Sequence, residues 1–381
     1  MGAGGPFDDF PHTEFLAEVI RAYGEEPFAD LQVDLVFNGD TLDLLKTSWG
    51  GTHPHHITAE IAAGKLGRII DAHPAFFDAL ADFLEPGPDR RRVWFVVGNH
   101  DIDLLFTAVR EGIRARIGAD RESVRFPGLE LDIGDLHIEH GSQADPMFAL
   151  DPETPFLMHE GQRILDLPWG TIGLLEVALR LQPLLHHHDR LKPRETLFEL
   201  LPEVRDLLHS VAFRYWTRDY WRNWLRHRDP VKKVSWTLFK EIGYRLGTQD
   251  FELRVANHYR ARLMHGPHRV IVVGHEHVAG MWTWGDRRLL RTGCIRDEFM
   301  LEEGGAVLSP IPKSWAEIYL QEGRTVRSHL IDAHGPPPPP DWLPESIFDV
   351  LPQVRALLAA SDAPELNAAM DEQEAREAKD S

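Results

Sequence analysis

The sequence predicts an α/β fold that is interrupted by a large helical insertion, and three observations lead to this prediction. Three apolar segments have the composition of buried strands, polar residues follow each of them directly, and a fourth strand candidate ends at His140-Gly141. Stretches with helical spacing of apolar residues lie between the first two of these segments and after the second. From about residue 156 to residue 262 the spacing is almost wholly helical, and this stretch is too long for a simple loop.

Three of the four strand candidates are rich in β-branched and aromatic residues, and each of these three is closed by a glycine that permits a sharp turn. The segment 129–139 also contains an internal turn at Gly134-Asp135. The candidates and the residues that follow them are 33–37 before Asn38-Gly39-Asp40, 93–97 before Gly98-Asn99-His100-Asp101, 129–139 before His140-Gly141, and 270–273 before Gly274-His275-Glu276-His277.

Helical spacing predicts helices over residues 57–84, with a break at Pro74, and over residues 102–117. The run Pro336–Pro340 is typical of a stiff, extended exit, and the acidic, Ala-rich residues 361–381 favour one helix with frayed ends.

Further strand-like pieces follow the last of the four candidates, at residues 281–284, 288–292 and 315–320. We therefore expect a core in two parts, separated by the insertion. The expected order is residues 1–150 for the first part of the core, 151–265 for the helical insertion, 266–333 for the second part, and 334–381 for the exit and tail.

The charge of the chain argues against a general nucleic-acid binder. The formal net charge is −19, from 41 Lys and Arg against 60 Asp and Glu, whereas phosphate backbones are held by clustered cations. Residues 151–265 differ, with 18 Lys and Arg against 15 Asp and Glu, which leaves −22 for the rest. The single cysteine, Cys294, excludes an internal disulfide framework. With no apolar run of membrane-spanning length and no secretion signal in residues 1–7, we expect a cytoplasmic protein.

The residues that follow the four strands have the chemistry of a metal site. A carboxylate, an amide and imidazoles, without thiolate, suit Mn, Fe or Zn more than Ca. Two ions about 4 Å apart can activate a water for an in-line displacement, and His100 is placed to protonate the leaving group. Asp101 is a second catalytic candidate, and either Asp101 or Asp43 could orient an imidazole. The candidate ligands are Asp40, Asn99, His140, His275 and His277.

Together these motifs resemble the calcineurin-like metallophosphoesterase family, in that family's order along residues 1–150 and 266–333. The resemblance also includes Arg291-Thr292-Gly293-Cys294, which is similar to the strand after the last motif. It implies a four-layer α/β/β/α sandwich and a metal-dependent hydrolase that cleaves a phosphate ester or pyrophosphate through a metal-bridged hydroxide. In the expected arrangement Asn99, His140 and His275 hold one divalent ion, Asp40 bridges, and His277 holds the second ion.

One departure from the family concerns its first motif, Asp-x-His, which completes the second ion's ligands. Met1-Gly2 is similar to the residues after that motif, so we expect the true start to lie upstream. The triplets at Asp71/His73, Asp135/His137 and Asp332/His334 lie at the wrong places to substitute. The chain also resembles, loosely, the UDP-2,3-diacylglucosamine pyrophosphatases, although Ser142 replaces an acidic residue. The substrate would then be a nucleotide-type pyrophosphate or another small phosphate ester.

Arginines recur every four residues in the insertion, interleaved with aromatic side chains. The simplest interpretation is a solvated helix face with an aromatic core. Alternatively Arg214, Arg218 and Arg222 bind an anionic substrate as part of a lid, or the helix makes a peripheral membrane contact with anionic lipid. We expect His186-His187-His188 to be a solvated run and Cys294 to be a buried structural thiol.

A rival interpretation is a catalytically weakened, phosphoesterase-like binding module that recruits partners through the helical insertion. The absence of the first motif favours this module, whereas His100 and Asp101 favour an enzyme. The oligomeric state, the native metal and the substrate stay open at this point.

Overall fold

The structure, a computed structural model, describes residues 1–4, 8, 10–220, 229–232, 240, 251–301, 308–337 and 346–360, without the side chains of residues 219, 251–256, 308 and 360. Helices and several sheets alternate along the chain, so the predicted α/β class is confirmed. The helix expected within residues 361–381 and most of the proline run lie outside the described residues.

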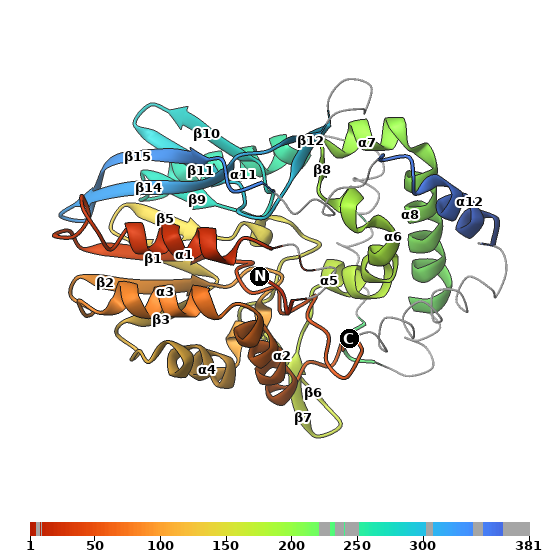
Figure 1. The fold of residues 1–381 in the computed structure, drawn as a ribbon, viewed down its shortest axis with the longest axis horizontal. Coiled ribbons are helices and arrows are strands. Elements are labelled where there is room, and N and C mark those ends of the chain that lie inside the picture. Colours follow the sequence, from red (N-terminus) through yellow and green to blue (C-terminus); the bar gives the residue numbers. More distant parts are fainter. Residues whose placement is uncertain are drawn as a thin grey trace.

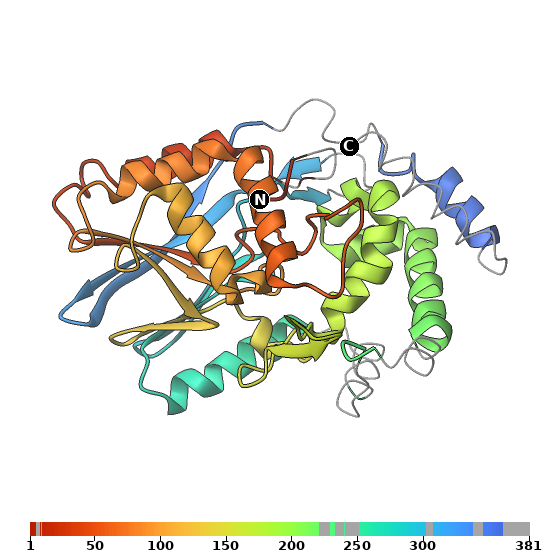
Figure 2. The same ribbon diagram turned by 90° about the horizontal axis from the view of Figure 1, so that it is seen from below.

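The first sheet is parallel, has the strand order β1-β2-β3, and is covered by four helices (Figures 1 and 2). Alternate residues of β2 point to the helices, where Phe95 stacks on Phe37 with ring centroids 5.1 Å apart. Pro74 begins α3 directly after α2, as its inability to continue a helix predicts. The elements are α1 (Thr13–Ala22), β1 (Val33–Asn38), α2 (Ala59–Ala72), α3 (Pro74–Leu84), β2 (Arg91–Val96), η1 (Ile102–Leu105), α4 (Thr107–Ile117) and β3 (Val124–Gly128).

The second sheet has the order β10-β11-β9-β5-β4, in which β5, β9 and β11 are parallel and the two edge strands are antiparallel. The turn predicted at Gly134-Asp135 separates β4 from β5. The helix α11 covers one face of this sheet through Tyr259 and Leu263. The elements are β4 (Glu130–Ile133), β5 (Leu136–Glu139), α11 (Phe251–His265), β9 (Val270–Val273), β10 (Ala279–Trp284) and β11 (Arg287–Thr292).

The two sheets pack against each other through apolar side chains on their remaining faces. Val96 of the first sheet lies in one buried cluster with Ile138, Val272 and Leu290 of the second. Figure 2 shows α11 on the opposite side of the strands from α1, α2 and α3.

The inserted segment begins with a hairpin, so the prediction of helix from residue 156 onward is wrong at its start. Glu160 and Gly161 both have positive φ (49° and 79°), which matches the two-residue turn that suits antiparallel strands. Helices follow, as predicted. The elements are β6 (Phe156–His159), β7 (Gln162–Leu165), η2 (Ser142–Ala144) before them, and then α5 (Trp169–Gly173), η3 (Leu174–Ala178), α6 (Leu179–Asp189), β8 (Leu191–Lys192), α7 (Arg194–Leu200), α8 (Pro202–Arg214) and η4 (Tyr215–Tyr220).

A separate apolar cluster holds α6, α7 and α8 together, and it includes the C-terminal helix α12 (Leu351–Ala360). The prediction of a solvated histidine run is wrong, because His186 and His188 are buried on α6. The Nε2 atom of His188 lies 2.9 Å from the carbonyl oxygen of Ile347, which ties α6 to the segment before α12. The ring of Trp216 stacks on that of Trp169 with centroids 3.7 Å apart, so both side chains pack against this apolar cluster.

The remaining strands either pair with the helical insertion or pack beside the second sheet. The strand β12 (Phe299–Leu301) pairs with β8 of the insertion and with β13 (Leu308–Pro310). A long hairpin of β14 (Lys313–Gln321) and β15 (Arg324–Ala333) packs beside the second sheet. Among the described residues, no helix combines the length and apolar character that crossing a bilayer requires.

Candidate metal centre

Four of the five predicted ligands meet at one place, and we refer to Asp40, Asn99, His140 and His275 as the Asp40 cluster. The Nε2 atom of His140 lies 3.1 Å from Oδ2 of Asp40 and 3.2 Å from Oδ1 of Asn99. The Nδ1 atom of His275 lies 3.0 Å from the same oxygen of Asn99. Ligand atoms of Asp40, His140 and His275 all lie within 4.8 Å of one another. One cation could therefore contact all four side chains.

The strand topology explains this convergence. The four side chains follow β1, β2, β5 and β9, and each of these strands is parallel to its neighbour in its own sheet. Carboxyl ends of parallel strands meet at one edge, which is where ligands bind in open α/β sheets. The loops are so close that a Cβ at Gly98 would lie 2.3 Å from Oδ1 of Asp40. A Cβ at Gly39 would lie 2.5 Å from Nδ1 of His140, so both glycines are required.

The backbone at the ligand residues is strained. Asp40, His275 and His277 have positive φ values of 52°, 67° and 55°, a region that residues with a Cβ rarely adopt. Such strain persists only where surrounding contacts enforce it, and it concentrates at functional sites.

His140 is held in a single orientation by its second ring nitrogen. Its Nδ1 atom donates to the carbonyl oxygen of Asn38 at 2.8 Å, which leaves Nε2 facing the Asp40 cluster. On the other side, Nε2 of His275 lies 3.5 Å from Oδ2 of the buried Asp145. Sequence reasoning missed Asp145, because no motif marks a carboxylate five residues after His140.

The electrostatics of the Asp40 cluster favour an ionised carboxylate. Burial alone would raise the pKa of Asp40, but the imidazoles of His140 and His100 hold that pKa well below its usual range. Burial would lower the pKa of His140, whereas the Asp40 carboxylate raises it to about 9. A cation bound at Nε2 of His140 would compete with a proton for the same nitrogen.

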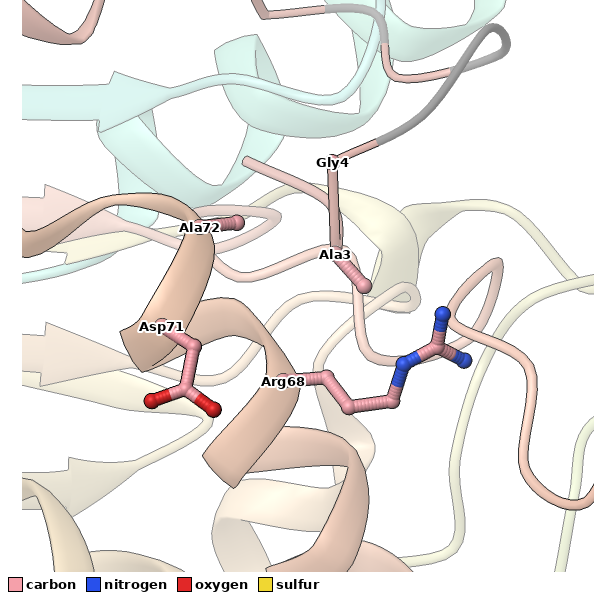
Figure 3. A pocket seen from close by; sticks show the side chains of 5 residues that line it. All are labelled: Ala3, Gly4, Arg68, Asp71 and Ala72. Carbon is pink, nitrogen blue, oxygen red and sulfur yellow. The ribbon is translucent and has the colours of Figure 1, made fainter. Parts of the chain in front are cut away.

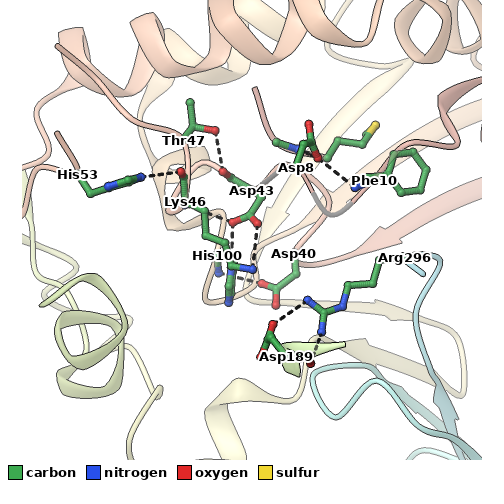
Figure 4. Close-up of polar contacts among 12 residues, drawn as sticks. Asp8, Phe10, Asp40, Asp43, Lys46, Thr47, His53, His100, Asp189 and Arg296 are labelled. Carbon is green, nitrogen blue, oxygen red and sulfur yellow. Dashed lines mark hydrogen bonds and ion pairs between the residues drawn. The ribbon is translucent and has the colours of Figure 1, made fainter. Parts of the chain in front are cut away.

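His100 lies beside the Asp40 cluster and contacts the residue predicted to orient it (Figure 4). Its Nδ1 atom is 2.9 Å from Oδ1 of Asp43, and its backbone N–H donates to Oδ1 of Asp40 at 2.8 Å. Lys46 adds a positive charge 3.7 Å from the other oxygen of Asp43. Burial alone would raise the pKa of Asp43, but Lys46 and His100 lower it.

Asp101, the second catalytic candidate, is buried and joins two loops. Its carboxylate accepts hydrogen bonds from the backbone N–H groups of Gly98 at 2.6 Å and Thr41 at 2.9 Å. Burial and the nearby Asp40 raise the pKa of Asp101 to about 6. These contacts favour a positioning role over the predicted catalytic one.

His277 has different neighbours, and we refer to His277, Cys294 and Glu298 as the His277 cluster. The Nδ1 atom of His277 lies 2.9 Å from Oε1 of Glu298, and ligand atoms of all three residues lie within 4.8 Å of one another. Arg296 also contacts Oε1 of Glu298, at 3.0 Å from Nε. The sequence did not indicate Glu298 as a site residue.

Among the described residues, Lys46 contacts Asp43 beside the Asp40 cluster, and Arg296 contacts Glu298 of the His277 cluster. Arg296 contacts Oδ2 of Asp189 at 3.2 Å, beside Asp40 and His100 (Figure 4). Arg214 is half-buried at the end of α8 and Arg218 is exposed in η4, and neither takes part in the contacts of the two clusters described above. Arg222 lies outside the described residues.

The misplaced Asp-x-His triplets have other partners. His73 lies 2.6 Å from Oγ1 of Thr13, and His137 lies between Asp132 at 2.6 Å and Glu139 at 3.1 Å. His137 is fully buried in a network that also ties Arg262 of α11 to Glu139 at 2.7 Å. This network anchors α11 on the second sheet.

A hollow of about 400 Å³ lies between the N-terminal segment and α2 (Figure 3). Its Arg68 is already committed to Ser48, since Nη1 donates to both the carbonyl and the hydroxyl oxygen at 2.7 Å. None of the predicted ligands lines it. The lining residues are Ala3, Gly4, Arg68, Asp71 and Ala72.

Comparisons with protein-family models and with curated proteins found no match to this chain.

Proposed function

We propose that the protein is a metal-dependent phosphoesterase that hydrolyses a phosphate ester or pyrophosphate with two divalent ions of Mn, Fe or Zn. The observation that supports this most is the Asp40 cluster, in which each side chain, from four separate strand ends, lies within 3.2 Å of another member of the cluster. Its donors are nitrogen and oxygen atoms, which suit these metals. The helix–sheet–sheet–helix packing also supports the four-layer sandwich of the family that the motifs resemble.

Bound divalent ions would supply Lewis-acid charge and lower the pKa of a coordinated water. In this proposal Asp40, Asn99, His140 and His275 would hold one ion, and His277 would contribute to holding the second. His100 binds Asp43 through Nδ1, so its Nε2 atom remains to deliver a proton to the leaving oxygen. Asp101 keeps the loops after β1 and β2 in register.

The substrate would be a small molecule, a phosphate ester or nucleotide-type compound rather than a nucleic acid. Lys46 and Arg296 lie beside the clusters and would meet its anionic part. We place the reaction in the cytoplasm, because the only cysteine is an unpaired thiol and a reducing compartment suits it.

Hydrolysis of p-nitrophenyl phosphate and of its bis ester, with and without Mn²⁺, tests the proposal. We expect activity that requires the metal and that Asn99→Ala abolishes. The matched control is His209→Ala, at an exposed position on α8, which should keep full activity. A folded protein without activity on either compound, at any of the three metals, would favour a binding module instead.

A further inference from the structure

The His277 cluster lies at the same sheet edge as the Asp40 cluster, and strand pairing explains why. The strands β9 and β11 are parallel neighbours in register, with Arg291 opposite Val273. His277 follows the first strand and Cys294 follows the second, so their loops leave the sheet side by side. The turn at Gly293 has a φ of 71°, and a Cβ there would lie 2.6 Å from Oγ of Ser314. Glycine is therefore needed to bring Cys294 to this position.

Glu298 is buried, and among the described residues the hydrogen bonds to its carboxylate all reach one oxygen, Oε1. Oε1 is contacted by Nδ1 of His277 at 2.9 Å, by two nitrogens of Arg296 at 2.9 and 3.0 Å, and by Nζ of Lys192 at 3.6 Å. Within the part of the chain that the structure describes, Oε2 is buried without a hydrogen-bond partner. A buried carboxylate oxygen in this state is costly unless something binds it.

We propose that His277, Cys294 and Glu298 form a cation site of mixed nitrogen, sulfur and oxygen ligands, with Oε2 of Glu298 as its carboxylate donor. A thiolate, an imidazole and a carboxylate within 4.8 Å of one another suit Zn²⁺ best. Arg296 and Lys192 contact Oε1 and so hold the carboxylate in place, while Oε2 has no hydrogen-bond partner among the described residues. Cation binding replaces the thiol proton, which is released to solvent as the metal–sulfur bond forms.

The cation site and the proposed function both assign a cation to His277, but the cation site requires no hydrolysis. It adds Cys294 and Glu298 as ligands, and it makes the second ion chemically different from the first. The Asp40 cluster has no sulfur donor, so a thiolate signal can arise only at the His277 cluster.

Co²⁺ titration of the metal-free full-length chain tests this site by absorption spectroscopy. We expect a thiolate-to-cobalt charge-transfer band in the near ultraviolet, and its intensity should reach a limit when the one site that contains Cys294 is filled. Cys294→Ser should abolish the band, and Glu298→Gln should weaken the Co²⁺ affinity that the band reports by at least about ten-fold. The matched controls are His140→Ala, which should keep the band, and Glu153→Gln at an exposed position, which should change nothing.

Two results would overturn the inference: no band in the folded wild-type protein, or a band that Cys294→Ser leaves in place. Because Glu298 is buried beside Arg296, its variant is first checked by circular dichroism, and the Cys294 result decides the matter if that variant unfolds. A thiolate band in a protein without hydrolytic activity supports the site and counts against the proposed function alone. Hydrolysis without the band supports the proposed function and counts against the cation site.

Discussion

The Nε2 atom of His140 lies 3.1 Å from Oδ2 of Asp40, although one hundred residues separate them in the sequence. The contact joins the first sheet to the second, because Asp40 follows β1 and His140 follows β5. The geometry of the candidate metal centre thus depends on how the two sheets pack.

His140→Ala should remove one ligand of the first ion and lower the metal content of the purified protein. We expect at least about ten-fold weaker Mn²⁺ binding, because in the proposed site the imidazole is a direct ligand, and its loss leaves the half-buried Asp40 carboxylate without that partner. Isothermal titration of Mn²⁺ checks this, with the exposed His209→Ala as control. Equal Mn²⁺ affinity in the variant and in wild type would exclude His140 from the site.

His100→Ala should reduce turnover roughly 100-fold or more while the metal content stays close to wild type, as loss of a general acid predicts. Asp43→Asn should lower turnover less, because it only changes the partner of Nδ1. Steady-state kinetics and metal analysis of the same samples provide the two readouts. If His100→Ala lost metal and activity together, the residue would be a ligand and not an acid.

Gly98→Ala should disrupt the metal centre although it adds only a methyl group. The new Cβ would lie 2.3 Å from Oδ1 of Asp40, so the carboxylate or the loop after β2 must move. Gly67→Ala is the control, since a Cβ on that helical glycine meets nothing within 4 Å. We expect weak Mn²⁺ binding for the first variant and unchanged binding for the second; similar binding in both would show that the two loops are not closely packed.

Arg91→Lys should destabilise the fold by about 1–3 kcal/mol, because a buried ammonium cannot reproduce the contacts of the guanidinium. Arg91 is fully buried and donates to backbone carbonyls of the loop between α1 and β1, including those of Phe28 at 3.0 Å and Ala29 at 3.1 Å. Urea unfolding measures the change. Arg90→Lys, at an exposed position, should be neutral.

The contact between Asp229 and His56, at 3.0 Å, should make one tie between the insertion and the core sensitive to acid. Burial alone would raise the pKa of Asp229, but His56 and Lys232 lower it below its usual value. A carboxyl group whose pKa is lower in the folded state contributes stability above the unfolded value of about 3.9 and loses it as the pH falls through the folded value. Asp229→Asn should therefore cost about 1 kcal/mol near neutral pH.

That difference between Asp229→Asn and wild type should shrink as the pH falls from about 4 through the lowered folded pKa of Asp229, below which the wild-type carboxyl group is also neutral. Thermal unfolding of both proteins from about pH 2 to pH 7 checks this. A constant difference in melting temperature over that range would show that the carboxylate charge does not matter.

The parts of the fold that the sequence predicted are those with strong local signals. The strands β1, β2 and β9 each contain a run of apolar residues, and the break at Pro74 follows from the proline ring. The hairpin of β6 and β7 was missed because its apolar residues are also compatible with helical spacing, and only the turn at Glu160-Gly161 distinguishes the two. The burial of His186 was missed because it depends on packing between elements distant in sequence.

The candidate site shows the same division. Asp40, Asn99, His140 and His275 could be predicted because each directly follows a strand and matches a motif. Glu298 carries no motif, and only the return of the chain after β11 places it beside His277. Asp145 likewise reaches His275 through a short 3₁₀ turn, η2, that the sequence does not specify.

Anomalous diffraction at the manganese edge, from crystals grown with Mn²⁺, tests the metal centre most directly. We predict a peak at roughly 2.0–2.3 Å from Oδ2 of Asp40, Oδ1 of Asn99, Nε2 of His140 and a ring nitrogen of His275. A peak only at the network of Asp132, His137 and His268, or no peak within reach of Asp40, would contradict the proposed phosphoesterase site.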